Sequence, residues 1–135
     1  MGTTVTERFL KYVAVDTMSE PEKENIPSTE KQKNLGAMLA EDLRAIGAED
    51  VKMDGHGYVY GTIPATCTVK KIPVLGFIAH MDTAPACSGK DVKPRLVKNY
   101  DGGEIVMNQE TGLSMGPGQY PELLNYVGND LITTD

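Results

Sequence analysis

The amino-acid sequence predicts an α/β protein in which a mixed sheet is covered by helices. Three observations support this fold class. Two segments near the start carry apolar residues at helical spacing, and a later segment, residues 73–79 (PVLGFIA), is apolar without alternation. A strand of that composition is typical of a sheet buried on both faces, and two one-sided helices are available to cover it.

The first predicted helix spans residues 4–15, where Val5, Phe9, Tyr12 and Val13 recur at helical spacing and form one apolar face. A polar segment with two prolines, residues 19–27, follows it and predicts a loop.

The second predicted helix spans residues 29–46. Thr29 with Gln32 resembles a capping box, and Ser28 is the alternative cap. Gly47 stands where a left-handed residue commonly ends a helix. The apolar stripe of this helix predicts packing against a core, and it consists of Leu35, Met38, Leu39, Leu43 and Ile46.

Beyond residue 49 the pattern favours strands. Residues 50–63 predict a hairpin, with His56 solvated at its tip and ranked well below His80 as a ligand. Residues 95–97 and 104–107 flank Asp101-Gly102-Gly103 and predict a second hairpin. A short helix over residues 121–126 and a strand over 131–134 complete the prediction.

Composition excludes several classes of function. The chain has 135 residues, 40% hydrophobic and 24% charged, which fits one globular domain. Its net charge of -6, without a lysine or arginine cluster, argues against binding to nucleic acid or an acidic membrane. We expect a cytoplasmic protein with Cys67 and Cys87 reduced, because the sequence has neither a signal peptide nor an apolar run long enough to span a membrane.

His80 and Asp82 are the candidate functional residues. In an extended chain, residues two apart point to the same side, and both lie just beyond the carboxyl end of the predicted buried strand. Open α/β sheets bind ligands at that end. A neutral imidazole is a good zinc ligand, and a nearby carboxylate can accept the other ring N–H and so orient the ring.

The residues alone leave alternatives open. His80 could be a core histidine bonded to backbone, Asp82 could cap a turn, or the pairing could be coincidence. A catalytic zinc takes three protein ligands, and this chain has two histidines. The carboxylates of Asp54, Asp101 and Glu104 could contribute, but their spacing does not indicate it. Either the site binds no metal, or its remaining ligands lie outside these residues.

The stretch PVLGFIAHMDTAP resembles the strand and metal motif of the zinc-dependent exopeptidases of the aminoacylase and carboxypeptidase G type. Within that family the resemblance is closest to the bacterial tripeptide aminopeptidases. The supporting stretches run in order along the chain and are RFLKYVAVDTMS, IPSTEKQ, GYVYGTIPA, SGKDVKP, NYDGGEI and YPELLNYVGNDLITTD.

The resemblance implies a function and roles for two residues. His80 would bind one of two zinc ions, and Asp82 would orient His80 and count as catalytic. The implied reaction removes the N-terminal residue of a tripeptide, with a metal-activated water as nucleophile and a glutamate as general base. A homodimeric enzyme is implied as well.

The resemblance also implies that residues 1–135 are the N-terminal segment of the catalytic domain, without the small dimerisation domain. The remaining zinc ligands would lie beyond Asp135, so we expect the chain alone to be inactive. Ala86 stands where the family pattern has an aspartate. The alternative functions are a dipeptidase or deacylase of the same family, and a non-catalytic α/β binding module.

Overall fold

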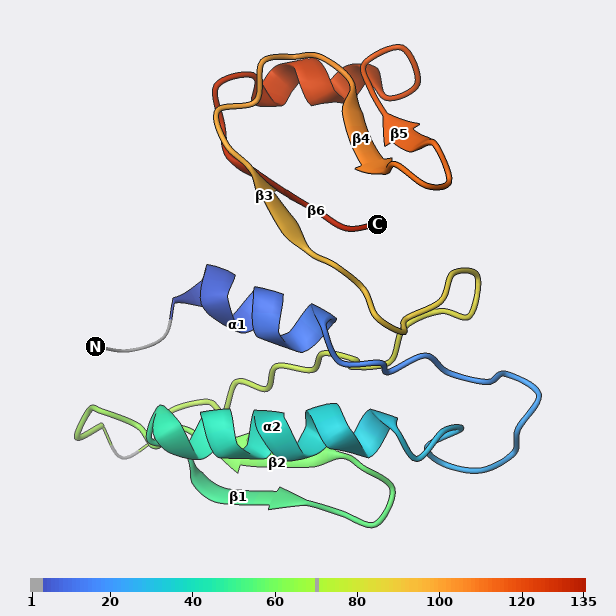
Figure 1. The fold of residues 1–135 in the computed structure, drawn as a ribbon. Coiled ribbons are helices and arrows are strands. Elements are labelled where there is room, and N and C mark those ends of the chain that lie inside the picture. The colour runs from blue at the N-terminus through green and yellow to red at the C-terminus, as the bar shows by residue number, and fades with distance from the viewer. Residues whose placement is uncertain (1–3, 70) are drawn as a thin grey trace. The chain divides into compact units, whose positions relative to one another are not determined.

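The computed structural model describes residues 4–69 and 71–135, which divide into two compact units (Figure 1). One unit contains the described residues up to Ala14 together with Asp91–Asp135, and the other is Val15–Lys90. Each unit is described by itself.

The unit Val15–Lys90 is built on a helix and a hairpin. Helix α2 (Gln32–Ala45) is followed by strands β1 (Glu49–Met53) and β2 (Val59–Thr62), which pair antiparallel. Asp54 organises the turn between the strands, because its Oδ1 accepts hydrogen bonds from the backbone N–H groups of His56 and Tyr58. The predicted hairpin is therefore confirmed, with His56 exposed at its tip.

The two ends of α2 differ in how well the sequence predicted them. Gly47 is left-handed, with a φ of 88°, and the Ala48 N–H bonds to the Leu43 carbonyl at 3.0 Å, so the predicted glycine stop is confirmed. The predicted capping box is wrong, because α2 begins at Gln32 without a side-chain cap. Gln32 Nε2 instead donates to the hydroxyls of Ser28 and Thr29.

Helix α2 packs on the hairpin through small residues. Gly36 and Ala40 are buried, and a Cβ on Gly36 would lie 2.7 Å from Met53 Sδ, which indicates a close approach of helix and strand. The predicted apolar stripe is only partly buried: Leu35 is buried, Ile46 is exposed, and Met38, Leu39 and Leu43 lie between these extremes.

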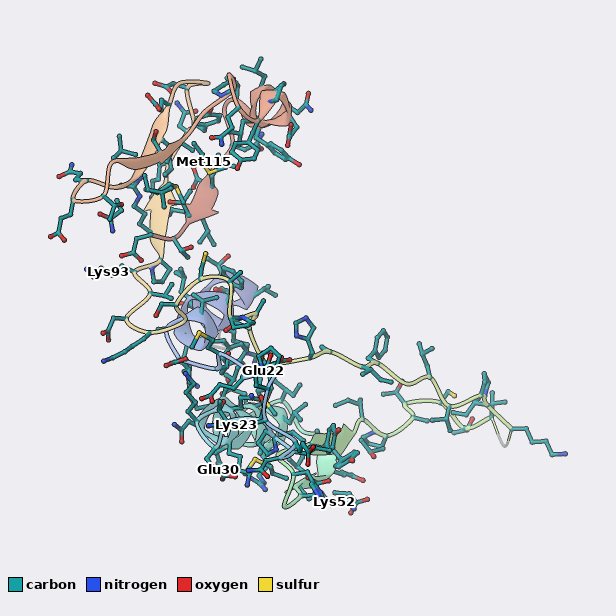
Figure 2. The ribbon with its side chains drawn as sticks, turned by 90° about the vertical axis from the view of Figure 1, so that its right-hand side faces the viewer. Glu22, Lys23, Glu30, Lys52, Lys93 and Met115 are labelled. Atoms are coloured by element: carbon teal, nitrogen blue, oxygen red, sulfur yellow. The ribbon has the colours of Figure 1, made fainter. Side chains whose placement is uncertain are left out.

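The predicted buried strand at residues 73–79 is wrong. These residues form no strand, and Val74, Leu75, Phe77 and Ile78 are 76–101% exposed. Figure 2 shows the segment after β2 extending away from the other elements of its unit. An apolar run without alternation is buried only where neighbouring strands and helices cover both of its faces, and the described residues supply no strand beside it.

The other unit begins with α1 (Val5–Val13), where a helix was predicted. A reciprocal pair of hydrogen bonds between Thr4 and Glu7 caps its N-terminus. None of its side chains is buried, and Phe9 is 46% exposed. The prediction that this helix packs on a sheet through its apolar face is therefore wrong for the described chain.

The second predicted hairpin has the right strands but the wrong partners. Strand β3 (Arg95–Val97) pairs antiparallel with β6 (Leu131–Thr133), and β4 (Ile105–Asn108) pairs with β5 (Leu113–Met115). The Asp101-Gly102-Gly103 turn forms, with Gly103 N–H bonded to Asp101 Oδ1, but it leads from one sheet to the other.

Backbone bonds explain this pairing. The N–H of Tyr100 donates to Asn129 O at 2.9 Å and the N–H of Gly128 donates to Tyr100 O at 2.8 Å, which extends the β3–β6 contact past the strand ends. The predicted short helix is confirmed as the 3-10 helix η1 (Pro121–Tyr126). A small core of Tyr100, Ile105 and Leu123 joins these elements.

The α/β class is confirmed, and the described residues form helices with three two-stranded antiparallel sheets rather than one mixed sheet. Within residues 4–69 and 71–135, no helix is both long and apolar enough to cross a membrane.

The close contact between α2 and β1 predicts that only a small side chain can be accommodated at position 36. Gly36→Ala should leave the free energy of unfolding nearly unchanged, because the flexible tip of Met53 can turn away and alanine gains about 1 kcal/mol of helix propensity. Gly36→Leu should lower it by about 1–3 kcal/mol through overpacking. Urea unfolding followed by circular dichroism measures both, and Ala37→Leu, at an exposed position of the same helix, is the control. Equal midpoints for Gly36→Leu and Ala37→Leu would contradict the packing.

The uncovered apolar run predicts surface hydrophobicity. We expect the chain to bind anilinonaphthalene sulfonate and to self-associate, and the double variant Val74→Lys, Phe77→Lys to lose most of both, since contiguous exposed apolar groups drive such binding. The control is Val5→Lys, at a valine that is 84% exposed outside this run. Dye fluorescence and sedimentation velocity report the outcome, and equal dye binding by the double variant and the wild type would refute the expectation.

Candidate functional site

His80 and Asp82 contact each other at the end of the extended segment. His80 Nδ1 lies 2.9 Å from the backbone carbonyl oxygen of Asp82 and 3.2 Å from Asp82 Oδ1. The side chain of His80 is 85% exposed and that of Asp82 is 42% exposed. The predicted juxtaposition of the two side chains is confirmed, although no buried strand precedes it.

This geometry assigns the tautomer of His80. Both groups facing Nδ1 are acceptors, so Nδ1 carries the proton of the neutral ring and donates it to them. The lone pair on Nε2 is then free and directed away from Asp82. A neutral imidazole in this state, with a carboxylate on its other nitrogen, has the form of a histidine prepared to bind a metal ion.

The donor set fits part of a zinc site. His80 offers one nitrogen ligand and Asp82 an orienting carboxylate, but residues 4–69 and 71–135 contain no group of three His, Cys, Asp or Glu side chains that could hold a metal. The other carboxylates considered from the sequence serve locally: Asp54 and Asp101 accept backbone N–H groups in turns, and Glu104 accepts from the Ser114 hydroxyl.

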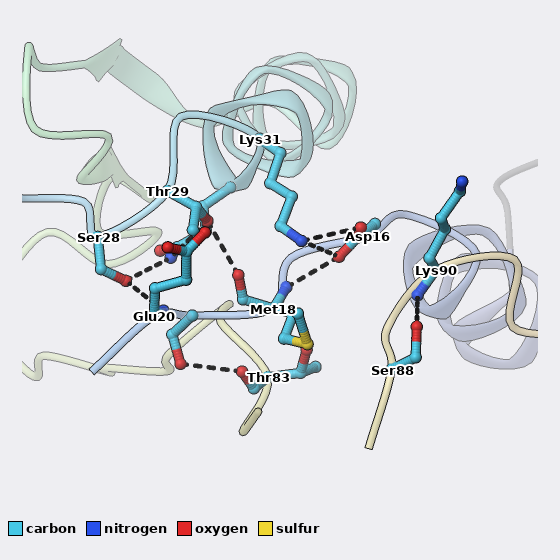
Figure 3. Close-up of polar contacts among 11 residues, drawn as sticks. Asp16, Met18, Glu20, Ser28, Thr29, Lys31, Thr83, Ser88 and Lys90 are labelled. Atoms are coloured by element: carbon cyan, nitrogen blue, oxygen red, sulfur yellow. Dashed lines mark hydrogen bonds and ion pairs between the residues drawn. The ribbon is translucent and has the colours of Figure 1, made fainter. Parts of the chain in front are cut away.

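Thr83, directly after Asp82, anchors the site. An isolated parallel bridge joins it to Met18. Its N–H donates to Thr17 O at 3.1 Å, and its carbonyl accepts from the Ser19 N–H at 2.9 Å. The Ser19 hydroxyl donates to the same carbonyl at 3.0 Å (Figure 3).

The segment Thr17–Ser19, to which Thr83 is bonded, is in turn hydrogen-bonded to residues at the start of α2. Met18 O accepts the Thr29 hydroxyl at 2.9 Å. Lys31 Nζ lies 2.9 Å from Asp16 Oδ1, and Asp16 Oδ1 also accepts the Met18 N–H (Figure 3). Thr17 and Thr29 are buried, whereas the side chains of Lys31 and Asp16 remain partly exposed.

Charge and hydrogen bonding act together on Asp16. The Lys31 ammonium, bonded to its carboxylate, and the Met18 N–H lower the pKa of Asp16 below its ordinary value of 3.8, with a smaller contribution from the charge of Lys90. Asp16 is therefore ionised throughout the neutral range.

Sequence reasoning found His80 and Asp82 but not Asp16, Thr29 or Lys31 as residues of the same locality. The signal for the contact between His80 and Asp82 is a spacing of two along the chain. The bond between Lys31 and Asp16 spans 15 positions and that between Ser19 and Thr83 spans 64, distances over which periodicity carries no information.

Nearly all of this chain is similar to part of peptidase T. It is 54% identical over 132 residues to peptidase T of Alkaliphilus oremlandii, a match that covers 97% of this chain and 32% of that protein. It is 50% identical to peptidase T of Geobacillus kaustophilus and 48% identical to that of Bacillus pumilus, each over 135 residues. No family model matches the chain.

The chain thus spans about a third of the length of the curated relatives that it matches. The resemblance predicted from the sequence is confirmed, and the relatives that carry it are named peptidase T.

The ion pair at Asp16 predicts a pH dependence. The folded-state pKa lies below the unfolded one, so ionised Asp16 stabilises the fold above pH 3.8, and this contribution is lost as pH falls through the lowered folded-state pKa. Lys31→Met should raise the pKa of Asp16 toward its ordinary value, as measured by NMR titration of the Asp16 carboxyl carbon.

The matched control is Lys33→Met, which removes a lysine of the same helix that pairs with Glu30 rather than with Asp16. Lys33→Met should leave the Asp16 titration unchanged. An Asp16 pKa that is equal in the wild type and in Lys31→Met would show that the ion pair is absent in solution.

Proposed function

We propose that residues 1–135 form part of the catalytic domain of a two-zinc tripeptide aminopeptidase, which releases the N-terminal residue of tripeptides. The observation that carries the proposal is the match of 97–100% of the chain to peptidases T at 48–54% identity. The exposed His80–Asp82 pair supports it, because its geometry suits one ligand and one orienting group of a metal site.

His80 would hold a zinc ion through Nε2, the nitrogen that its contacts with Asp82 leave unprotonated. Asp82 would keep the ring in that tautomer and raise its basicity by accepting the Nδ1 proton. When bound, zinc would supply a Lewis acid for the carbonyl of the peptide bond. The other zinc ligands and the general base would come from outside residues 1–135.

The proposal also covers the compartment, the oligomeric state and the partners of the whole enzyme. We infer from the resemblance that it is a cytoplasmic homodimer whose small domain mediates dimerisation, and that it acts on neither nucleic acid nor membranes. The acidic composition, with a net charge of -6, agrees with a small peptide substrate rather than a polyanion.

If the general base lies outside residues 1–135, the chain alone should hydrolyse tripeptides more than about a hundredfold more slowly than full-length peptidase T of Geobacillus kaustophilus. Loss of a general base typically costs roughly 10²–10⁴ in rate. The measurement is release of the N-terminal amino acid from a tripeptide with zinc added. Turnover by the chain alone equal to that of the relative, and unchanged by His80→Ala, would refute both the incompleteness and the role of His80.

A chimaera tests the function itself. This chain would replace the matching third of the Geobacillus kaustophilus enzyme, and the chimaera should hydrolyse tripeptides. His80→Ala should lower its activity at least about a hundredfold by removing a metal ligand, and Asp82→Asn about 10–100-fold by weakening the orientation of the ring. His56→Ala, at the hairpin tip, should have no effect.

Substrate choice separates the alternatives. A folded chimaera that cleaves dipeptides or N-acyl amino acids but not tripeptides would favour the dipeptidase or deacylase reading. A chimaera that keeps full activity after His80→Ala would exclude His80 as a zinc ligand.

A further inference from the structure

The His80–Asp82 pair needs support from elsewhere in the fold. It follows residues 73–79, which form no strand and leave their large apolar side chains exposed. The contacts between His80 and Asp82 are also internal to the motif. In the described part of this unit, the first backbone attachment of the motif to another segment comes at Thr83.

Thr83 is bonded through both its N–H and its carbonyl to the segment Thr17–Ser19. Two backbone hydrogen bonds of 2.9 and 3.1 Å and the Ser19 hydroxyl at 3.0 Å fix it. Because Thr83 is adjacent to Asp82, the position of this bridge determines where the Asp82 carbonyl and carboxylate can lie.

The bridge itself depends on two side chains from the start of α2. Thr29 is a buried residue with 8% exposure, and its hydroxyl donates to Met18 O and accepts from Gln32 Nε2. Lys31 holds Asp16, whose Oδ1 accepts the Met18 N–H. Met18 is therefore restrained at its N–H through Lys31 and at its carbonyl through Thr29.

The backbone at Gly89 packs against the bridge as well. A Cβ on Gly89 would lie 3.2 Å from Thr83 Oγ1 and 3.3 Å from Asp16 Oδ1, so the backbone of the returning loop lies directly against both residues. Gly89 thus limits movement of Asp16 and Thr83 on this side, although Thr83 is exposed and Asp16 and Met18 are half-buried.

We propose that Thr29 and Lys31 are positioning residues for the His80–Asp82 pair, acting through the bridge between Met18 and Thr83. They hold Asp82 where it can accept the Nδ1 proton of His80 and so keep Nε2 free for a ligand. The catalytic meaning of this arrangement rests on the proposed function, but the arrangement itself does not.

The test reads the tautomer of His80 directly. Ring nitrogen NMR shifts of the 135-residue chain are recorded over a pH series, and the tautomers are compared where the shifts themselves show both rings to be uncharged. His56, exposed at the hairpin tip, is an internal reference for an unconstrained ring. In the wild type, His80 should show Nδ1 protonated, the reverse of the Nε2-protonated form that free histidine favours.

Thr29→Val and Lys31→Met should shift the His80 ring nitrogens toward those of His56, because both variants release the bridge. The conservative variants Thr29→Ser and Lys31→Arg should keep the ring nitrogen shifts of His80 at their wild-type values. Lys33→Met should leave them unchanged, since Lys33 pairs with Glu30 on the same helix. Amide signals of α2, β1 and β2 verify that each variant is folded.

If Thr29→Val fails to fold, Lys31→Met decides the test by itself, because it removes a part-buried side chain whose bond is to Asp16. Wild-type shifts for His80 in every folded variant of the pair Thr29→Val and Lys31→Met would overturn the inference. That result would not touch the proposed function. Conversely, an inactive chimaera together with the predicted tautomer changes would reject the function and keep the positioning role.

Discussion

The arrangement of the candidate site depends on the parallel bridge between Met18 and Thr83. It joins segments 65 positions apart and brings the region after His80 onto the start of α2. The bonds that make it are neutral, and Thr83 is itself exposed, but Thr17 on the partner segment is buried and the ion pair of Lys31 with Asp16 lies beside it. The candidate pair of His80 and Asp82 follows an extended segment and is attached to the fold at this bridge, whereas α2 and its hairpin are held by packing.

What the sequence predicted correctly is local. Both helices, the hairpin around His56 and the glycine that ends α2 depend on residues within a few positions of one another, so spacing and turn chemistry reveal them. Pairing between β3 and β6 was not predictable in this way, because the partners are separated by more than thirty residues and the Asp101-Gly102-Gly103 turn suggested a nearer partner. The buried strand at residues 73–79 failed for another reason: its composition specifies an environment, and the described residues do not provide it.

In the candidate site, too, the local contact was predictable from the sequence and the long-range contacts were not. His80 and Asp82 were identifiable because an extended backbone brings residues two apart to one side, and their contact at 3.2 Å follows from that geometry. Asp16, Thr29 and Lys31 carry no comparable pattern, since an Asp-Thr pair and a Thr-x-Lys triplet occur widely in turns and helix starts. Only the fold brings them to the residue that follows Asp82.

The exposed apolar run and the exposed histidine belong to one extended segment, and this links the two features physically. Electrostatic interactions at a metal site strengthen when water is excluded, yet His80 is 85% exposed here. Val74, Leu75, Phe77 and Ile78 lie within six residues of it, with both faces of the run bare. Any protein surface that covered these side chains would also bring a low-dielectric wall close to His80. Burial of the run would therefore change the electrostatic surroundings of His80, whereas the Met18–Thr83 bridge is formed while the run is exposed.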